Sequence, residues 1–186
     1  MSKYYTDVRV VGNNIYYRGV KNGVRHREKI TYSPTLFVPS NKQTEWKTFH
    51  GESLAENNPE EVIAWDYKDL CIANIDIEVG SENGFPEPKA AAEPITAITV
   101  KFSNKDKYYV FGIGDYKKHR EDVEWFQCED EYHLIKMFMQ VWTNNYPDAI
   151  TGWNVYGFDI PYIINRFAKI AGEDTMKKLS PWGYVS

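Results

Sequence analysis

Two carboxylates separated by one residue lie within the mostly apolar stretch from Leu70 to Val79. Side chains on a strand alternate between its two faces, so Asp76 and Glu78 would point the same way, two rises of about 3.3 Å apart. On a central strand this pair costs free energy unless a cation offsets both charges. Mg²⁺ suits the position because it takes carboxylate oxygens as ligands and completes its shell with water and substrate phosphate.

An exposed edge strand with an acidic outer face is the alternative interpretation of an isolated Asp-x-Glu pair, because short motifs often match by chance. The apolar flanks of the pair, and its expected place in the middle of a sheet, argue against that alternative. A third carboxylate nearby would favour a metal site over an ordinary strand surface.

Asp159 is the candidate for that third carboxylate. An Asp just before a helical pattern with Pro161 in its first turn is typical of a helix N-cap, and the capping role does not exclude a role as a ligand. The strand expected at 149–153 should lie beside the Asp76 strand. A residue just past its C-terminal end could therefore reach the same crevice.

Three acids in a sheet crevice favour metal-assisted hydrolysis over other chemistries. The sequence has no thiol nucleophile in a recognisable setting, and neither GxSxG nor GxxxxGK[ST] occurs in it. The histidines fall at no ligand spacing, and we assign them to the surface or the core. They are His26, His50, His119 and His133.

Composition excludes several classes of protein. The 186 residues carry 22 Lys and Arg against 26 Asp and Glu, a net charge of −4, which argues against nucleic-acid binding by bulk charge alone but not against binding through metal ions. No apolar run approaches the roughly 18 residues of a membrane helix, and no signal peptide is evident, so we expect a soluble, intracellular protein with no membrane segment. Two cysteines fit a reducing compartment.

The first part of the chain predicts a small β region. Apolar and polar residues alternate between residues 3 and 39, and the turn signals Gly12-Asn13-Asn14 and Asn22-Gly23 indicate hairpins, so we expect three or four antiparallel strands. Residues 40–61 are polar and indicate a linker or a remnant of something larger.

The rest of the chain predicts an α/β domain with a mixed sheet, because a hairpin followed by a helical crossover returns to a parallel strand. The ligand crevice should lie beside the 71–79 strand, where the strand order switches. The apolar face expected for the last long helix comprises Ile160, Ile163, Ile164, Phe167 and Ile170. The expected elements are strands at 62–65, 70–79, 95–102, 108–113 and 123–127, a helix from 129–131 ended by Pro147, a buried strand at 149–153 and a helix from Asp159.

The segment 74–78, Asn-Ile-Asp-Ile-Glu, resembles the first exonuclease motif of family B DNA polymerases, and 154–159, Asn-Val-Tyr-Gly-Phe-Asp, resembles the second. The surrounding phrases at 84–88, 151–154 and 159–162 are similar to those of replicative polymerases from T-even-type bacteriophages and their marine relatives. The resemblance runs from about Cys71 to Pro181, and more weakly over the N-terminal strands.

The resemblance implies an RNase H-like (DnaQ-like) exonuclease fold and 3′→5′ proofreading of DNA in the cytoplasm of a bacterial host. By the same resemblance Asp76, Glu78 and Asp159 would bind two Mg²⁺ or Mn²⁺ ions, which activate water and stabilise the leaving 3′ oxygen. The expected DNA contacts, with the 3′ end of a single strand, are Phe85, Asn154 and Phe158. A loop aromatic folded back onto the core is the alternative for Phe85.

The sequence departs from the family pattern in three ways. A third exonuclease motif, which provides a fourth acid, would lie beyond Ser186, and the palm, fingers and thumb are absent. A piece of the family's N-terminal domain is skipped. We therefore expect a shortened N-terminal β-hairpin region at 1–61 and an exonuclease-like domain at 62–186, truncated before the third motif.

Three hypotheses follow from these departures. The chain could be the front part of a polymerase whose remaining segment, or another chain, supplies the missing acid. It could be a non-catalytic module that binds single-stranded DNA or a replication protein. It could also be a distinct RNase H-like nuclease with its own replacement acid, for which Glu173 and Asp174 are the candidates.

Overall fold

The computed structural model describes residues 3–31, 67–82, 84–115, 117 and 120–185. The chain divides into two compact units, one within residues 1–69 and the other within residues 70–186, and each has its own sheet. The expected linker at 40–61, the strand at 62–65 and the domain boundary between residues 61 and 62 lie outside the described residues.

The first unit contains an antiparallel sheet of strands β1 (Lys3–Val11), β2 (Asn14–Lys21) and β3 (Val24–Thr31) in that order. The turn between β2 and β3 has positive φ at Asn22 (54°) and Gly23 (76°), as the tightest hairpins require. The expected hairpins are confirmed here. The 3₁₀ helix η1 (Tyr67–Asp69) ends this unit, and Arg25 Nη1 donates a hydrogen bond of 2.8 Å to the Asp69 carbonyl oxygen.

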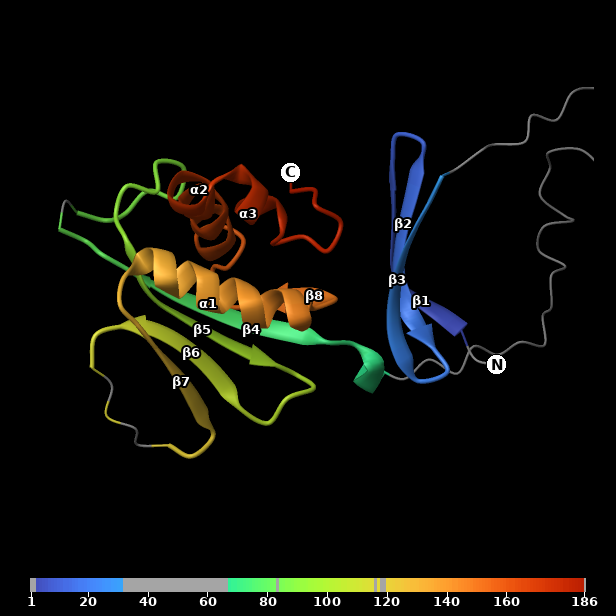
Figure 1. Cartoon of the computed structure of the whole chain (residues 1–186), viewed down its shortest axis with the longest axis horizontal. Coiled ribbons are helices and arrows are strands. Elements are labelled where there is room, and N and C mark those ends of the chain that lie inside the picture. The colour runs from blue at the N-terminus through green and yellow to red at the C-terminus, as the bar shows by residue number, and fades with distance from the viewer. Residues whose placement is uncertain (1–2, 32–66, 83, 116, 118–119, 186) are drawn as a thin grey trace, which may run out of the picture. The chain divides into compact units, whose positions relative to one another are not determined.

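The second unit contains a mixed five-stranded sheet in the order β7-β6-β5-β4-β8 (Figure 1). The pairs β4/β5 and β5/β6 are antiparallel, whereas β6/β7 and β4/β8 are parallel. The strands are β4 (Ile72–Val79), β5 (Ile95–Phe102), β6 (Tyr108–Ile113), β7 (Val123–Cys128) and β8 (Ala149–Thr151).

Helix α1 (Glu131–Asn144) begins where the acidic first turn predicts, and its N-cap is Asp130, whose side chain accepts a hydrogen bond of 2.8 Å from the His133 N–H. Its apolar stripe enters the core against the sheet: the Phe138 ring centre lies 5.7 Å from that of Phe111 on β6. The buried residues of the stripe are Leu134, Ile135, Phe138, Met139 and Trp142.

Helix α2 (Asp159–Ala171) is followed by the short helix α3 (Glu173–Lys177). Ile163 and Phe167 of the expected apolar face are buried, but Ile160, Ile164 and Ile170 are only partly buried. Their expected places in the core belong instead to Tyr162 and Arg166, because these two side chains turn toward backbone groups of the β4–β5 connection.

The expectation of a buried strand at 149–153 is wrong. Strand β8 has three residues, all exposed, and it forms the edge of the sheet. Its pairing with β4 ends at Thr151, opposite Asn74, because the chain turns away at Gly152 and leaves Trp153 with 91% of its surface exposed.

Strand β4 alternates as its sequence predicts. Ala73, Ile75 and Ile77 are buried, and the polar residues between them are exposed. Helices packed on a mixed sheet confirm the expected α/β class, preceded by a small antiparallel sheet.

Candidate active site

Asp159 is the first residue of α2, and its carboxylate is held against the sheet. Its Oδ1 accepts a hydrogen bond of 3.1 Å from the backbone N–H of Ile77 on β4, and the residue is only 4% exposed. The N-cap of α2 is Phe158, and no side chain caps the helix there. The carboxylate thus binds the neighbouring strand from inside the helix, so the interpretation of Asp159 as the N-cap is wrong.

The edge of β4 explains how Asp159 reaches this position. Beyond the short pairing with β8, Gly152 packs so closely on the Ile75 carbonyl oxygen that a Cβ on this glycine would lie 2.4 Å from it. Ile77 is the next residue of β4 to face this side of the strand, and its N–H is the one bound by Asp159. Beyond the last residue of β8, the loop at Gly152 and the first residue of α2 therefore contact the same edge of β4.

Asp76 and Asp159 are electrostatically coupled. Burial raises the pKa of Asp159, and the negative charge of Asp76 raises it further, whereas the hydrogen bond from Ile77 opposes the rise. Across the part of the chain that the structure describes, neither carboxylate has an ion-pair partner. The structure therefore brings these two predicted residues together, and no basic side chain among the described residues pairs with them.

Glu78 lies on the same exposed face of β4 as Asp76. A bulge follows it in the pairing with β5, and its carbonyl oxygen accepts a hydrogen bond of 3.2 Å from Thr96 Oγ1. The described residues contain no group of three His, Cys, Asp or Glu side chains close enough to hold one metal ion. The three predicted carboxylates are therefore not gathered into a closed cluster.

The donor set nevertheless fits a hard divalent cation. Mg²⁺ and Mn²⁺ take carboxylate oxygens, and Mg²⁺ usually binds through one or two of them while keeping several waters. Asp159 and Asp76 supply such oxygens, one of them from a buried side chain whose charged form is disfavoured by its surroundings. A cation between them would offset both charges.

An aromatic contact joins the β4–β5 connection to α2. Phe85 is 87% exposed, and its ring centre lies 5.5 Å from that of Phe158, which in turn lies 5.5 Å from the ring of Tyr162. The alternative interpretation, in which Phe85 folds back onto the core, is therefore wrong. The Phe85 ring is tilted by 50° against that of Phe158, and most of its surface is open to solvent.

Asn154 shapes the turn that leads into α2. Its φ is positive (50°), and its carbonyl oxygen accepts hydrogen bonds of 2.9 Å from the N–H groups of Gly157 and Phe158. A Cβ on Gly157 would lie 2.5 Å from Asn154 Oδ1, so the glycine gives this side chain its room. The predicted residue Asn154 therefore acts on the backbone that positions Asp159, and its exposed side chain lies over Gly157.

The alternative acids lie elsewhere on the second unit. Glu173 and Asp174 are exposed on α3, and a Glu173 carboxylate oxygen lies 3.4 Å from Lys177 Nζ. Neither residue belongs to a metal-binding group in the described ranges. Sequence reasoning missed Gly152, Tyr162 and Arg166; the only sequence signal for the last two is that they follow Asp159 at helical spacing.

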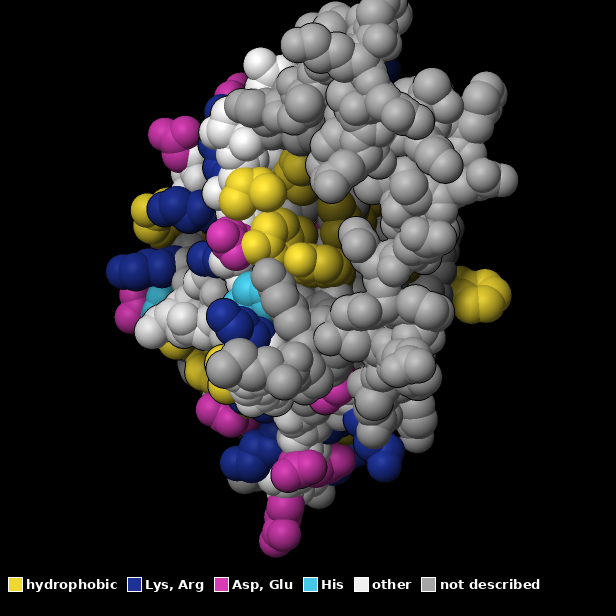
Figure 2. Space-filling model, turned by 90° about the vertical axis from the view of Figure 1, so that its right-hand side faces the viewer, with side chains coloured by type: hydrophobic (Ala, Val, Ile, Leu, Met, Phe, Trp, Pro, Cys, Tyr) yellow, Lys and Arg dark blue, Asp and Glu magenta, His cyan; other side chains and the backbone are white. Residues whose placement is uncertain are grey.

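Two further features concern the surface of the molecule and its helices. On the face drawn in Figure 2 several yellow hydrophobic side chains gather near the centre, and blue and magenta side chains lie side by side around the coloured part of that face. None of the helices in the described ranges combines the length and the apolar character needed to cross a bilayer.

Comparison with known proteins gives one family. The model for "DNA polymerase family B, exonuclease domain" matches residues 20–184. The DNA-directed DNA polymerase of Escherichia phage RB69 is 28% identical over 244 aligned positions, which cover 97% of this chain and 27% of that polymerase. The DNA-directed DNA polymerase of Enterobacteria phage T4 is 27% identical over 246 positions, covering 100% of this chain and 27% of its own length.

A more distant match covers part of the chain. The DNA polymerase catalytic subunit of Human herpesvirus 8 type P (isolate GK18) is 31% identical over 110 residues, or 56% of this chain and 11% of that subunit. The chain thus spans 27% of the length of the two phage polymerases.

Proposed function

Because the chain belongs to the exonuclease-domain family of family B DNA polymerases, we propose that it is the 3′→5′ exonuclease portion of a phage replicative polymerase and hydrolyses the 3′ terminus of a DNA primer. The family match confirms the resemblance seen in the two motifs and, with it, the RNase H-like α/β fold. One observation carries the proposal: the buried carboxylate of Asp159 lies against β4 beside Asp76 with no cationic partner in the described part of the chain.

In the proposed mechanism Asp76, Glu78 and Asp159 hold Mg²⁺ or Mn²⁺. Two such ions, when bound, supply an activated water and stabilise the leaving 3′ oxygen. The protein's own contribution is to orient the ligands. The hydrogen bond from the Ile77 N–H fixes the Asp159 carboxylate against β4, and β4 presents Asp76 and Glu78 on one face.

Phe85 and Phe158 provide the proposed contact with the frayed end of the primer. A base stacked on an aromatic ring gains about 1–3 kcal/mol in single-strand sites. The exposed ring of Phe85, supported from one side by Phe158, offers such a surface. Asn154 belongs to the proposed DNA-binding set through the turn that it shapes before Phe158.

The proposed partners are the 3′ end of single-stranded DNA and the remaining segment of the polymerase, or another chain, that supplies a further acid. We propose that the chain acts in the cytoplasm of the phage's bacterial host, with no membrane involved. We also propose a shortened N-terminal region at 1–61 and an exonuclease-like domain at 62–186. The alignments with the two phage relatives are longer than this chain of 186 residues, so they include positions that the chain lacks, which supports a shortened region.

The test measures Mn²⁺-dependent release of label from a 3′-labelled single strand. The samples are this chain, its Asp76→Ala variant, and this chain mixed with the remaining polymerase segment. Asp106→Ala, which removes an exposed carboxylate in the turn between β5 and β6, is the matched control. We expect cleavage that depends on Mn²⁺ and Asp76 and is strongest in the mixture. Cleavage that persists in Asp76→Ala would contradict the proposal.

A second candidate function is a non-catalytic module that binds single-stranded DNA or a replication protein. The observation that favours it is the absence of a three-ligand metal group from the described residues. Binding of the strand without cleavage in every sample, including the mixture, would establish this function in place of the first.

A further inference from the structure

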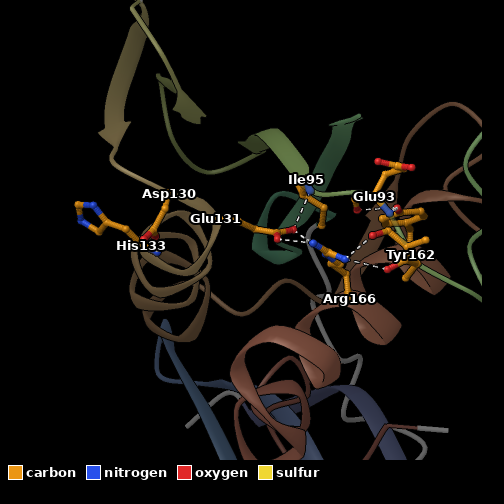
Figure 3. A network of polar contacts seen from close by, with 9 residues as sticks. Glu93, Ile95, Asp130, Glu131, His133, Tyr162 and Arg166 are labelled. Carbon is orange, nitrogen blue, oxygen red and sulfur yellow. Dashed lines mark hydrogen bonds and ion pairs between the residues drawn. The ribbon is translucent and has the colours of Figure 1, made fainter. Parts of the chain in front are cut away.

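A buried ion pair lies between α2 and α1 (Figure 3). Arg166 donates to both carboxylate oxygens of Glu131, from Nε at 2.8 Å and from Nη2 at 2.6 Å, and the two side chains are only 9% and 11% exposed. The same Glu131 oxygen that binds Nε also accepts a hydrogen bond of 2.7 Å from the Ile95 N–H at the start of β5. Glu131 is the first residue of α1, and its carboxylate is held in place by the start of β5 and by Arg166 of α2.

The remaining nitrogen of Arg166 binds the chain between β4 and β5. Its Nη1 donates hydrogen bonds of 3.0 Å and 2.8 Å to the carbonyl oxygens of Ala91 and Ala92. The Tyr162 hydroxyl donates to the Glu93 carbonyl oxygen at 2.7 Å and accepts from the Glu93 N–H at 3.1 Å. One face of α2 therefore holds three successive residues of this connection by their backbone.

The backbone at Ala91 is held in a conformation that it would not adopt readily by itself. Its φ is 41°, in the left-handed region that L-residues other than Gly, Asn and Asp rarely occupy. The residue is completely buried, its N–H donates to the Glu87 carbonyl oxygen at 2.9 Å, and its own carbonyl oxygen accepts from Arg166. Such a conformation persists only where its surroundings determine it.

Phe85 lies near the start of this connection, residues 84–94, whereas the residues that Arg166 and Tyr162 hold lie near its end. The Phe85 ring contacts Phe158, and the Phe158 ring contacts Tyr162, which together with Asn165 and Arg166 donates hydrogen bonds to backbone oxygens of the connection. Both ends of the connection are therefore attached to α2, one through aromatic rings and the other through Arg166 and Tyr162. The same helix begins with Asp159.

We propose that Arg166, oriented by Glu131, is a positioning residue that fixes the 84–94 connection so that Phe85 faces the 3′-terminal base of a bound strand. The inference rests on the proposed function and deepens it. It assigns binding of the terminal DNA base to a hydrogen-bond network that does not include the proposed metal ligands. Arginine is required at this position because its planar fork serves the carboxylate and two carbonyl oxygens at once, which a lysine ammonium cannot do.

The test compares two single strands that differ only at the 3′ end. One carries a normal terminal base, and the other has an abasic 3′ terminus that cannot stack on an aromatic ring. Binding is measured with EDTA present so that neither strand is cleaved. Loss of a stacked base corresponds to a factor of about 5 to 150 in affinity, so the wild-type chain should prefer the normal strand by a factor in that range.

We expect Arg166→Lys to lose most of that preference, as Phe85→Ala should, while its affinity for the abasic strand stays within about twofold of wild type. General loosening of the fold would weaken binding of both strands alike. Arg120→Lys is the matched control, because Arg120 makes a two-nitrogen contact with Asp122 on the exposed surface. Tyr162→Phe, which removes only the bonds to Glu93 and keeps the ring, should lower the preference in the same direction if Arg166→Lys does not fold.

A wild-type preference retained in both Arg166→Lys and Tyr162→Phe would overturn the inference while leaving the proposed function intact. A wild-type chain that shows no preference for the normal strand, and no cleavage when mixed with the remaining polymerase segment, would overturn both.

Discussion

The carboxylate of Asp159 accepts a hydrogen bond of 3.1 Å from the backbone N–H of Ile77, which lies 82 residues earlier in the chain. This bond ties the first residue of α2 to the strand that carries Asp76 and Glu78. Two properties of the Asp159 side chain can therefore be tested separately. The hydrogen bond needs only an oxygen acceptor, whereas a metal site needs the negative charge.

Asp159→Asn should keep the fold and abolish cleavage. The amide oxygen can still accept from Ile77, but the negative charge and one potential metal ligand are lost. We expect cleavage by the chain mixed with the remaining polymerase segment to fall by at least about 100-fold, because even outer partners of metal ligands contribute about 10- to 100-fold. Label release and urea unfolding measure the two effects. A variant that cleaves at the wild-type rate would contradict the assigned role.

The stability of the metal-free chain should fall as pH rises through the pKa of Asp159. Burial raises this pKa in the folded state, so the folded chain binds more protons than the unfolded chain between the ordinary and the raised value. The protonated form contributes stability below that window, and the contribution is lost above it. We expect this decline in urea midpoints for wild type relative to Asp159→Asn, and we expect Mn²⁺ to reduce it. Parallel pH profiles for the two proteins would refute the argument.

Gly152→Ala should destabilise the chain by about 1–3 kcal/mol, the usual cost of forcing extra volume into a packed site. The new Cβ would lie 2.4 Å from the Ile75 carbonyl oxygen, which belongs to a central part of β4 and cannot move freely. Gly80→Ala is the control, since its closest neighbour would be Pro94 Cδ at 3.3 Å. Urea unfolding compares them, and equal losses in the two variants would argue against a special role for Gly152.

Arg166→Met should cost about 3–5 kcal/mol of unfolding free energy, because it leaves the carboxylate of Glu131 buried without its partner. Adding Glu131→Met should recover only part of this loss, since the Ile95 N–H and the Ala91 and Ala92 carbonyl oxygens still lose their bonds. The double-mutant cycle measures the coupling. An additive result, with no recovery, would mean that the ion pair is not coupled.

Phe85→Ala should leave stability within about 0.5 kcal/mol of wild type, as expected for an exposed side chain. Its effect should appear in binding, where loss of one stacking surface costs about 1–3 kcal/mol for the terminal base. Tyr132→Ala, an exposed aromatic on α1, is the control and should change neither quantity. Fluorescence titration with a strand carrying 3′-terminal 2-aminopurine measures the binding, and an unchanged titration would exclude the stacking role.

Local pattern was enough to predict much of the sheet. The strands at 95–102 and 108–113 match their observed bounds because alternating side chains and the turn between them are both encoded locally. The burial of β8 was predicted wrongly, since an apolar run of this length does not reveal whether a strand lies at the centre or the edge of a sheet.

The candidate site was predictable only in part. The motif residues Asp76 and Asp159 follow from spacing and resemblance, but the bond from Asp159 to Ile77 depends on where α2 starts relative to β4. Arg166 was missed for a physical reason: a charged residue on a helix is usually solvated, and its partner Glu131 lies 35 residues away, so only tertiary packing makes it a core residue.

Helix α2 carries Asp159, Tyr162 and Arg166 on one buried face, at intervals of three and four residues. Because Tyr162 and Arg166 hold the connection that carries Phe85, a tilt or slide of α2 would shift the Asp159 carboxylate and the Phe85 ring together. If the domain hydrolyses primer ends as proposed, one displacement of α2 would therefore weaken both the metal site and the binding of the terminal base.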